Sequence, residues 1–159
     1  MTASSYSLTE FVEDLQKITA EHSEDSSILR EVTPLAQRFA ADPTWRDEKH
    51  YEADEEQGIG FHLLHEEPDN TLAVFAISWL PGKGVGPHNH RTWSVVVGVD
   101  GTELNIFWKR TDDGDKPGFA TIEETSRRDI GNGEVIGMDG NTIHSVINDG
   151  DQTTLSLHV

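Results

Sequence analysis

Three histidines provide the nitrogen atoms for a possible metal site. His88 and His90 are two residues apart in a stretch whose pattern predicts a β-strand. Because side chains alternate between the two faces of a strand, both imidazoles would project from one face toward one ion. His144 lies mid-strand in a second predicted strand, within a Gly- and Asn-rich context. We expect the three rings to hold one metal ion inside a small barrel and to support redox or hydrolytic chemistry.

The composition of the chain excludes several classes of function. The chain has 159 residues and a net charge of −17, and its length suits one domain. This charge disfavours binding to nucleic-acid phosphates and to anionic membranes. The absence of cysteine excludes disulfides, thiolate ligands and cysteine nucleophiles, and it fits a reducing compartment. The N-terminal residues resemble neither a signal peptide nor a membrane span, so we expect a cytoplasmic protein.

Residues 1–44 are predicted to be a helical lead. Apolar residues from 8 to 18 follow one helical stripe, and Ser7 with Glu10 forms a capping-box pattern at its start. A second short helix is expected over 28–32, and a third would start with Thr33 as its N-cap.

Residues 45–159 are predicted to form an antiparallel β-barrel. Short apolar stretches alternate with pairs such as Asp100-Gly101 and Asn132-Gly133, which tight hairpins prefer. The predicted strands cover residues 71–80, 92–99, 103–109, 142–147 and 153–159. Evenly spaced strands after a helical lead predict a mostly β, jelly-roll type of barrel in a single domain, 1–159.

The spacing of Gly82, His88 and His90 resembles the first motif of the cupin superfamily, in which a glycine precedes a His-x-His pair. Downstream, Gly133, His144 and Asn148 resemble the second cupin motif. The family's Pro and Gly between them are replaced by Asp139 and Asn141. The resemblance covers residues 59–159. It implies a double-stranded β-helix barrel in which His88, His90 and His144 are the metal ligands.

The sequence departs from the cupin pattern at the position of a metal-binding glutamate. Many cupins place a glutamate ligand shortly after the histidine pair, at positions held here by Ser94 and Val95. Glu103 lies beyond a predicted turn, and we expect it on the surface. Three neutral imidazoles would leave a divalent ion with its full charge, which favours an anionic ligand such as a thiolate or hydroxide.

A carboxylate-free site of this kind is similar to that of the thiol dioxygenases, a cupin family that includes cysteine and mercaptopropionate dioxygenases. Residues 79–82 (Trp-Leu-Pro-Gly) resemble the family's lead-in to the pair, and residues 90–93 (His-Arg-Thr-Trp) resemble its bacterial cysteine-dioxygenase-like branch. Ser156 and His158 resemble the start of its Ser-x-His-x-Tyr triad; the tyrosine would follow Val159. The resemblance implies ferrous iron, a small thiol and O2 as reactants, and a sulfinate product. Ser156 and His158 would form a hydrogen-bond chain that orients the pocket.

Cysteine dioxygenases hold the substrate carboxylate with an arginine on an early strand. Ungapped alignment places His62 at this position, where a protonated imidazole would be the clamp. Arg91 is the nearest fixed cation in sequence, although strand alternation turns it away from the face of His88 and His90. These two residues are the candidates for substrate binding.

Two other functions fit the same residues. Three histidines also hold Zn²⁺ in carbonic anhydrase, so a zinc-dependent hydrolase or isomerase is one alternative. A small-molecule-binding cupin without catalysis is the other. Three further histidines have no motif and are predicted to be surface groups: His22, His50 and His65.

Overall fold

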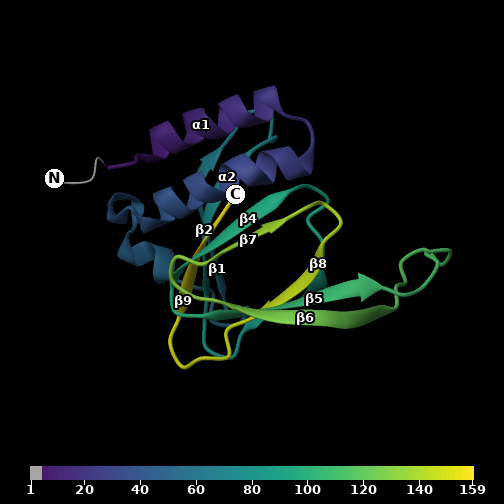
Figure 1. Cartoon of the computed structure of the whole chain (residues 1–159). Coiled ribbons are helices and arrows are strands. Elements are labelled where there is room, and N and C mark those ends of the chain that lie inside the picture. Colours follow the sequence, from purple (N-terminus) through teal and green to yellow (C-terminus); the bar gives the residue numbers. More distant parts are fainter. Residues whose placement is uncertain (1–4) are drawn as a thin grey trace.

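Two α-helices precede nine β-strands in the computed structural model, which describes residues 5–159 (Figure 1). The helices are α1 (Leu8–Glu21) and α2 (Asp25–Ala41), followed by two short 3₁₀ helices, η1 (Pro43–Trp45) and η2 (Glu48–Tyr51). The predicted capping box is confirmed. The Ser7 side chain accepts from the Glu10 backbone N–H, and the Ser7 backbone N–H donates to the Glu10 carboxylate.

The prediction of two short helices over residues 28–41 is wrong, because α2 is continuous with Pro34 inside it. A proline within a helix removes one backbone hydrogen bond. Buried Val32, Ala36 and Phe39 nevertheless continue one apolar stripe across Pro34. Burial of a large apolar side chain stabilises by about 1.5–3 kcal/mol, which offsets the lost hydrogen bond.

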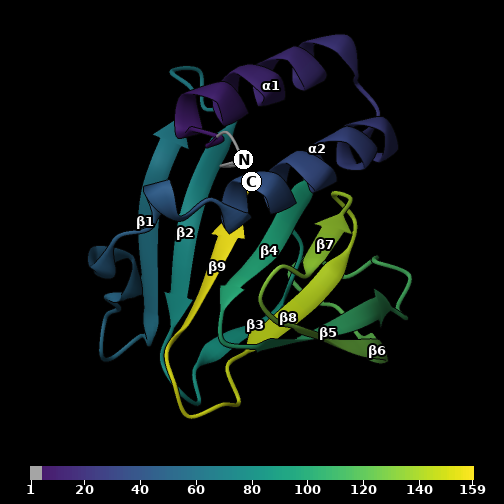
Figure 2. The same ribbon diagram turned by 60° about the vertical axis from the view of Figure 1, so that its left-hand side comes forward.

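The nine strands of the described chain form two antiparallel sheets. The first sheet has the order β1 (Ile59–Glu66), β2 (Ala73–Trp79), β9 (Thr154–His158), β4 (Ser94–Asp100) and β7 (Val135–Met138). The second has the order β3 (Gly84–His88), β8 (Ile143–Ile147), β5 (Glu103–Arg110) and β6 (Ile122–Ile130). The helices pack on one face of the first sheet, and the second sheet lies on its other side (Figure 2).

The five predicted strands correspond to β2, β4, β5, β8 and β9. Three strands were missed, namely β1, β6 and β7, and β3 overlaps the strand predicted through His88 and His90 only at His88. β3 contains two glycines and a proline, and most of β6 is exposed and polar, so neither carries the apolar alternation of a half-buried strand. The predicted turn pairs do lie in the connections, and Gly101 and Gly133 have the positive φ (69° and 78°) that such turns need.

Strands β4 and β9 of the first sheet are buried on both faces, and this determines where the functional side chains point. Val95 and Val97 of β4 and Leu157 of β9 pack with the helices, in a core that includes the stacked rings of Phe11 and Phe39. The alternate residues of β4 and β9 face the second sheet instead. The barrel interior therefore lies between the two sheets, and polar residues at the alternate positions point into it.

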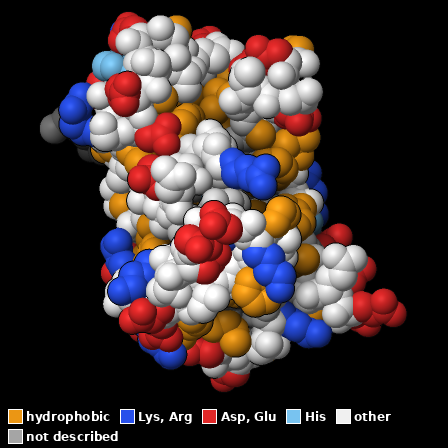
Figure 3. All heavy atoms as spheres, turned by 90° about the vertical axis from the view of Figure 1, so that its right-hand side faces the viewer, with side chains coloured by type: hydrophobic (Ala, Val, Ile, Leu, Met, Phe, Trp, Pro, Cys, Tyr) orange, Lys and Arg blue, Asp and Glu red, His pale blue; other side chains and the backbone are white. Residues whose placement is uncertain are grey.

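The excess negative charge is distributed over the surface. On the face shown in Figure 3, acidic side chains are interspersed with basic and apolar ones and do not form one continuous patch. Among the described residues, no helix is long and apolar enough to cross a membrane.

The capping box predicts a local contribution to stability. Ser7→Ala removes the hydroxyl that accepts from the Glu10 N–H, and we expect the free energy of unfolding to fall by about 1 kcal/mol in urea denaturation. Ser26→Ala, at an exposed position in the first turn of α2, is the control and should change stability little. Equal effects of the two substitutions would contradict the capping role.

Candidate metal centre

The two histidines of the pair come from different local structures. β3 ends at His88, and His90 lies in the loop that follows, so the prediction of one continuous strand through both is wrong. The β3–β8 pairing is also irregular between Val85 and His88. The two rings still converge, with centroids 5.1 Å apart and planes inclined by 25°.

His144 completes the cluster from the neighbouring strand. It lies on β8 directly opposite His88 in the β3–β8 pairing, and the centroids of these two rings are 4.6 Å apart. The Nε2 atom of His90 is 3.1 Å from Nε2 of His88 and 3.3 Å from Nε2 of His144. One nitrogen from each ring lies within 4.8 Å of the other two, so the three residues can hold one metal ion.

The outer ring nitrogens have partners that orient the inner ones. The Nδ1–H of His88 donates to the Gly86 carbonyl oxygen (2.8 Å), and the Nδ1–H of His144 donates to Oδ1 of Asn105 (3.0 Å). Since these oxygens only accept, both rings carry the proton on Nδ1 and keep a lone pair on Nε2. Histidine ligands of metals usually have such a partner on the second nitrogen.

Burial disfavours the charged forms of His90 and His144. Desolvation, together with the nearby charge of His88, lowers the pKa of His90. Desolvation and the charges of His88 and His90 lower the pKa of His144 to about 3. Protons therefore do not compete for the His144 lone pair at neutral pH, and the site suits a cation.

The donor set fits a divalent transition metal without a carboxylate ligand. Nε2 lone pairs that face one another at 3.1–3.3 Å repel unless a cation or a shared proton lies between them. At the position where many cupins have glutamate, the hydroxyl of Ser94 is 2.7 Å from Nδ1 of His90. Ser94 therefore orients a ligand without adding charge. Fe²⁺ and Zn²⁺ both accept imidazole nitrogen.

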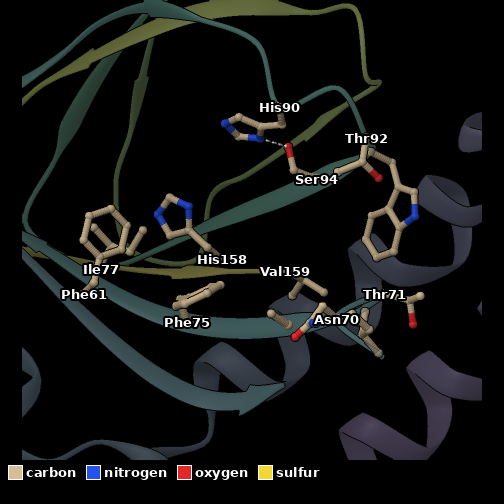
Figure 4. A pocket seen from close by; sticks show the side chains of 13 residues that line it. Phe61, Asn70, Thr71, Phe75, Ile77, His90, Thr92, Ser94, His158 and Val159 are labelled. Carbon is tan, nitrogen blue, oxygen red and sulfur yellow. Dashed lines mark hydrogen bonds between the residues drawn. The ribbon is translucent and has the colours of Figure 1, made fainter. Parts of the chain in front are cut away.

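A pocket of about 350 Å³ opens beside the histidines (Figure 4). His90 belongs both to the metal cluster and to the pocket wall, and His158 of β9 faces the same space. Aromatic and aliphatic side chains form most of the remaining wall, including Phe61, Phe75 and Trp93. A ligand in this pocket would contact His90 and lie next to the metal.

Behind His158 lies a buried hydrogen-bond chain. The His158 Nε2 is 2.9 Å from the Ser156 hydroxyl, which donates to the Glu103 carboxylate at 3.0 Å. Thr154 donates to the same carboxylate oxygen at 2.8 Å. The expectation that Glu103 lies on the surface is wrong, because its side chain is only 3% exposed. Desolvation raises its pKa, although the two hydroxyl donors act in the opposite direction.

His62 and Arg91, the candidate substrate contacts, do not line this pocket. His62 alternates with Phe61 along β1 and is on the opposite face, where its Nε2 bonds the Glu52 carbonyl oxygen at 2.9 Å. Arg91 is exposed, in the loop after His90. Their contact with a substrate therefore stays a prediction. His50, predicted to be a surface group, is buried and packs against the His62 ring.

Sequence reasoning missed Asn105 and the buried position of Glu103. Both are on β5, where Leu104 and Ile106 would ordinarily be the inward residues of an alternating strand. Glu103 and Asn105 are instead buried, because the barrel interior at this level holds the polar partners Ser156 and His144. Glu103 and Asn105 stand at alternate positions of a predicted strand, and this spacing could have indicated a shared polar face inside the barrel.

Comparison with known proteins identifies the fold. No protein-family model matches the chain. An oxalate oxidase in complex with the substrate analogue glycolate superimposes with a TM-score of 0.51 at 20% identity, over 75% of this chain and 60% of that one. The chain shares this fold, and its two antiparallel sheets agree with the mostly β cupin barrel that the sequence motifs predict. At this identity the likeness concerns the fold and not the reaction.

Two bacterial cupins have similar structures. A cupin superfamily protein from Desulfitobacterium hafniense is 17% identical, with a TM-score of 0.47 over 67% of this chain and 80% of its own. A cupin 2 conserved barrel domain protein from Salinispora arenicola is also 17% identical, with a TM-score of 0.49 over 71% of this chain and 83% of its own.

The contact of Asn105 with His144 predicts an effect on metal affinity. Asn105→Ala removes the oxygen that orients His144, and we expect Zn²⁺ or Fe²⁺ to bind about 10–100-fold more weakly in competition titrations. Asn105→Asp keeps an oxygen acceptor and should retain tight binding. Circular dichroism would verify that both variants are folded. Wild-type affinity in the alanine variant would exclude the orienting role.

Burial of Glu103 predicts a pH-dependent stability. Its folded pKa is raised above 4.5, so stability is greatest below this unfolded value and declines as the pH rises through the folded pKa. Glu103→Gln removes the ionisation and keeps an oxygen acceptor. Its melting temperature should be similar to wild type near pH 4.5 and higher at about pH 8. Glu66→Gln, at an exposed end of β1, is the charge-matched control. A difference between Glu103→Gln and wild type that is constant with pH would contradict the assignment.

Proposed function

We propose that this cupin is an iron-dependent thiol dioxygenase that converts a small thiol and O2 into a sulfinate. The observation that carries the proposal is the cluster of three histidines, His88, His90 and His144, with Ser94 in place of a carboxylate. An ion held this way keeps its full positive charge and favours an anionic sulfur ligand. The adjacent pocket supplies space for the rest of the molecule.

The overall reaction balances without a further reductant. A thiol R–SH and O2 give R–SO2⁻ and one proton, with two new S–O bonds, loss of the S–H bond and cleavage of the O–O bond. Sulfur loses four electrons, and the two oxygen atoms gain four. Ferrous iron, when bound, would supply the redox chemistry that lets O2 react with the sulfur.

His158 and Ser156 are the residues that we assign to orienting the reactants. The Ser156 hydroxyl donates to Glu103, so its oxygen is free to accept the His158 Nε2–H. This tautomer leaves Nδ1 of His158 without a proton and able to accept a hydrogen bond. Desolvation and the nearby ligand histidines lower the pKa of His158 to about 3, which keeps the ring uncharged.

Anaerobic reconstitution with Fe²⁺ tests the proposal. After addition of O2 and a panel of small thiols, we expect oxygen consumption and a sulfinate product by mass spectrometry. His144→Ala should lose both metal and activity, whereas His65→Ala, outside the cluster, should lose neither. His158→Ala should keep the metal and lose most of the rate. Absence of sulfinate with every thiol, despite stoichiometric iron, would refute the proposal.

A zinc-dependent hydrolase or isomerase is the second candidate, because three histidines are also a catalytic zinc site that acidifies bound water to a pKa of about 7. Metal analysis of protein purified without added metal separates the two. One equivalent of zinc, with no activity after iron reconstitution, would favour this candidate.

A further inference from the structure

The pocket beside the metal centre has no charged side chain in its wall. Within the described residues 5–159, the 13 lining residues include no Asp, Glu, Lys or Arg. The titratable side chains that face the space are His90, which belongs to the histidine cluster, and His158, whose Nε2 is 2.9 Å from the Ser156 hydroxyl. The other polar contributors are short amide or hydroxyl side chains, such as Asn70 and Thr92.

Strand alternation explains why the wall is apolar. β1 and β2 present Phe61, Phe75 and Ile77 to the pocket, and Phe61 pairs with Ile77 in the β1–β2 register. The next residue, His62, is on the opposite face of β1 and bonds the Glu52 backbone. The side that a carboxylate clamp would have to occupy therefore presents phenylalanine and isoleucine, as Figure 4 shows.

The charge of a bound metal ion and its ligands also disfavours a second charged group on the substrate. A divalent ion held by three imidazoles and no carboxylate would be partly neutralised by one thiolate. A second anionic group on the ligand would be transferred from water into an apolar wall with no cation to pair it, which is costly. An ammonium group would meet the ion's positive charge, and none of the described lining residues has an Asp or Glu side chain to pair with it. The net charge of −17 also repels anions as they approach.

We infer that the substrate is an uncharged thiol with a small aliphatic or aromatic body, and not an amino acid or a mercapto acid. The inference rests on the proposed function and names its substrate class. A volume of about 350 Å³ is at the lower end of small-molecule pockets, which measure about 300–1,000 Å³. Phe61, Phe75 and Trp93 provide aromatic surface for the body of the ligand.

Three thiols of similar length test the ligand class. They are 1-propanethiol, 3-mercaptopropionate and cysteamine, which end in a methyl, a carboxylate and an ammonium group. Calorimetry with the Fe²⁺-loaded protein under anaerobic conditions should show at least about tenfold weaker binding of both charged thiols. Equal or tighter binding of either charged thiol would overturn the inference, as would the failure of propanethiol to bind.

Installing a cation in the wall tests the cause. Phe61 is 64% exposed at the pocket and Leu63, which does not line it, is 53% exposed on the same strand. Phe61→Arg should raise the affinity for 3-mercaptopropionate relative to propanethiol several-fold, whereas Leu63→Arg, with the same change in net charge, should not. If both variants change the ratio of the two affinities equally, or neither changes it, then the absence of a cation in the wall does not explain the preference for propanethiol.

Measuring binding and turnover separately distinguishes the dioxygenase proposal from the proposal of an uncharged thiol ligand. If propanethiol binds in preference to the charged thiols but no sulfinate forms after O2 is added, the dioxygenase proposal fails and the ligand class holds. If sulfinate forms fastest from 3-mercaptopropionate or cysteamine, the dioxygenase proposal holds and the ligand class is wrong.

Discussion

Mutual repulsion of imidazole lone pairs is the constraint on which the centre of this barrel depends. The Nε2 atoms of His88, His90 and His144 are held close together, and the partners of the outer nitrogens prevent the rings of His88 and His144 from turning away. Burial lowers the pKa of His144 to about 3, so protonation of this ring does not relieve the arrangement at neutral pH. A cation satisfies all three nitrogens together, so the protein uses folding energy to preorganise a metal site.

The surrounding architecture supplies the rigidity that such a site requires. α1 and α2 bury one face of the first sheet, which leaves the other face of β4 and β9 to form the barrel interior. Ser94, Ser156 and His158 point inward from these strands because their neighbours Val95 and Leu157 are anchored under the helices. The second sheet contributes His144 and Asn105 from adjacent strands. Positions on paired strands are better fixed than positions on loops.

Ionisable groups inside the barrel are few and are kept uncharged or hydrogen-bonded. Glu103 accepts hydrogen bonds from the hydroxyls of Thr154 and Ser156, and Ser156 in turn contacts His158. Glu103 therefore acts on the site through Ser156, by helping to position His158. The pocket wall, in contrast, offers hydrocarbon on most sides. A cation held by the histidines would place a concentrated positive charge at one end of this apolar space, which is what the proposed ligand class requires.

The sequence by itself determined which three histidines cluster and the fold class, because histidine spacing, turn pairs and apolar stretches are local patterns. It determined the capping box at Ser7 for the same reason. Only the tertiary structure decided that Glu103 and Asn105 are buried, that His62 faces away from the pocket, and that α2 continues through Pro34. Each of these depends on what packs opposite the residue: a polar partner across the barrel, a neighbouring strand that fixes the register, or a sheet that buries both halves of a helix. Such partners are distant in the chain, and local periodicity carries no information about them.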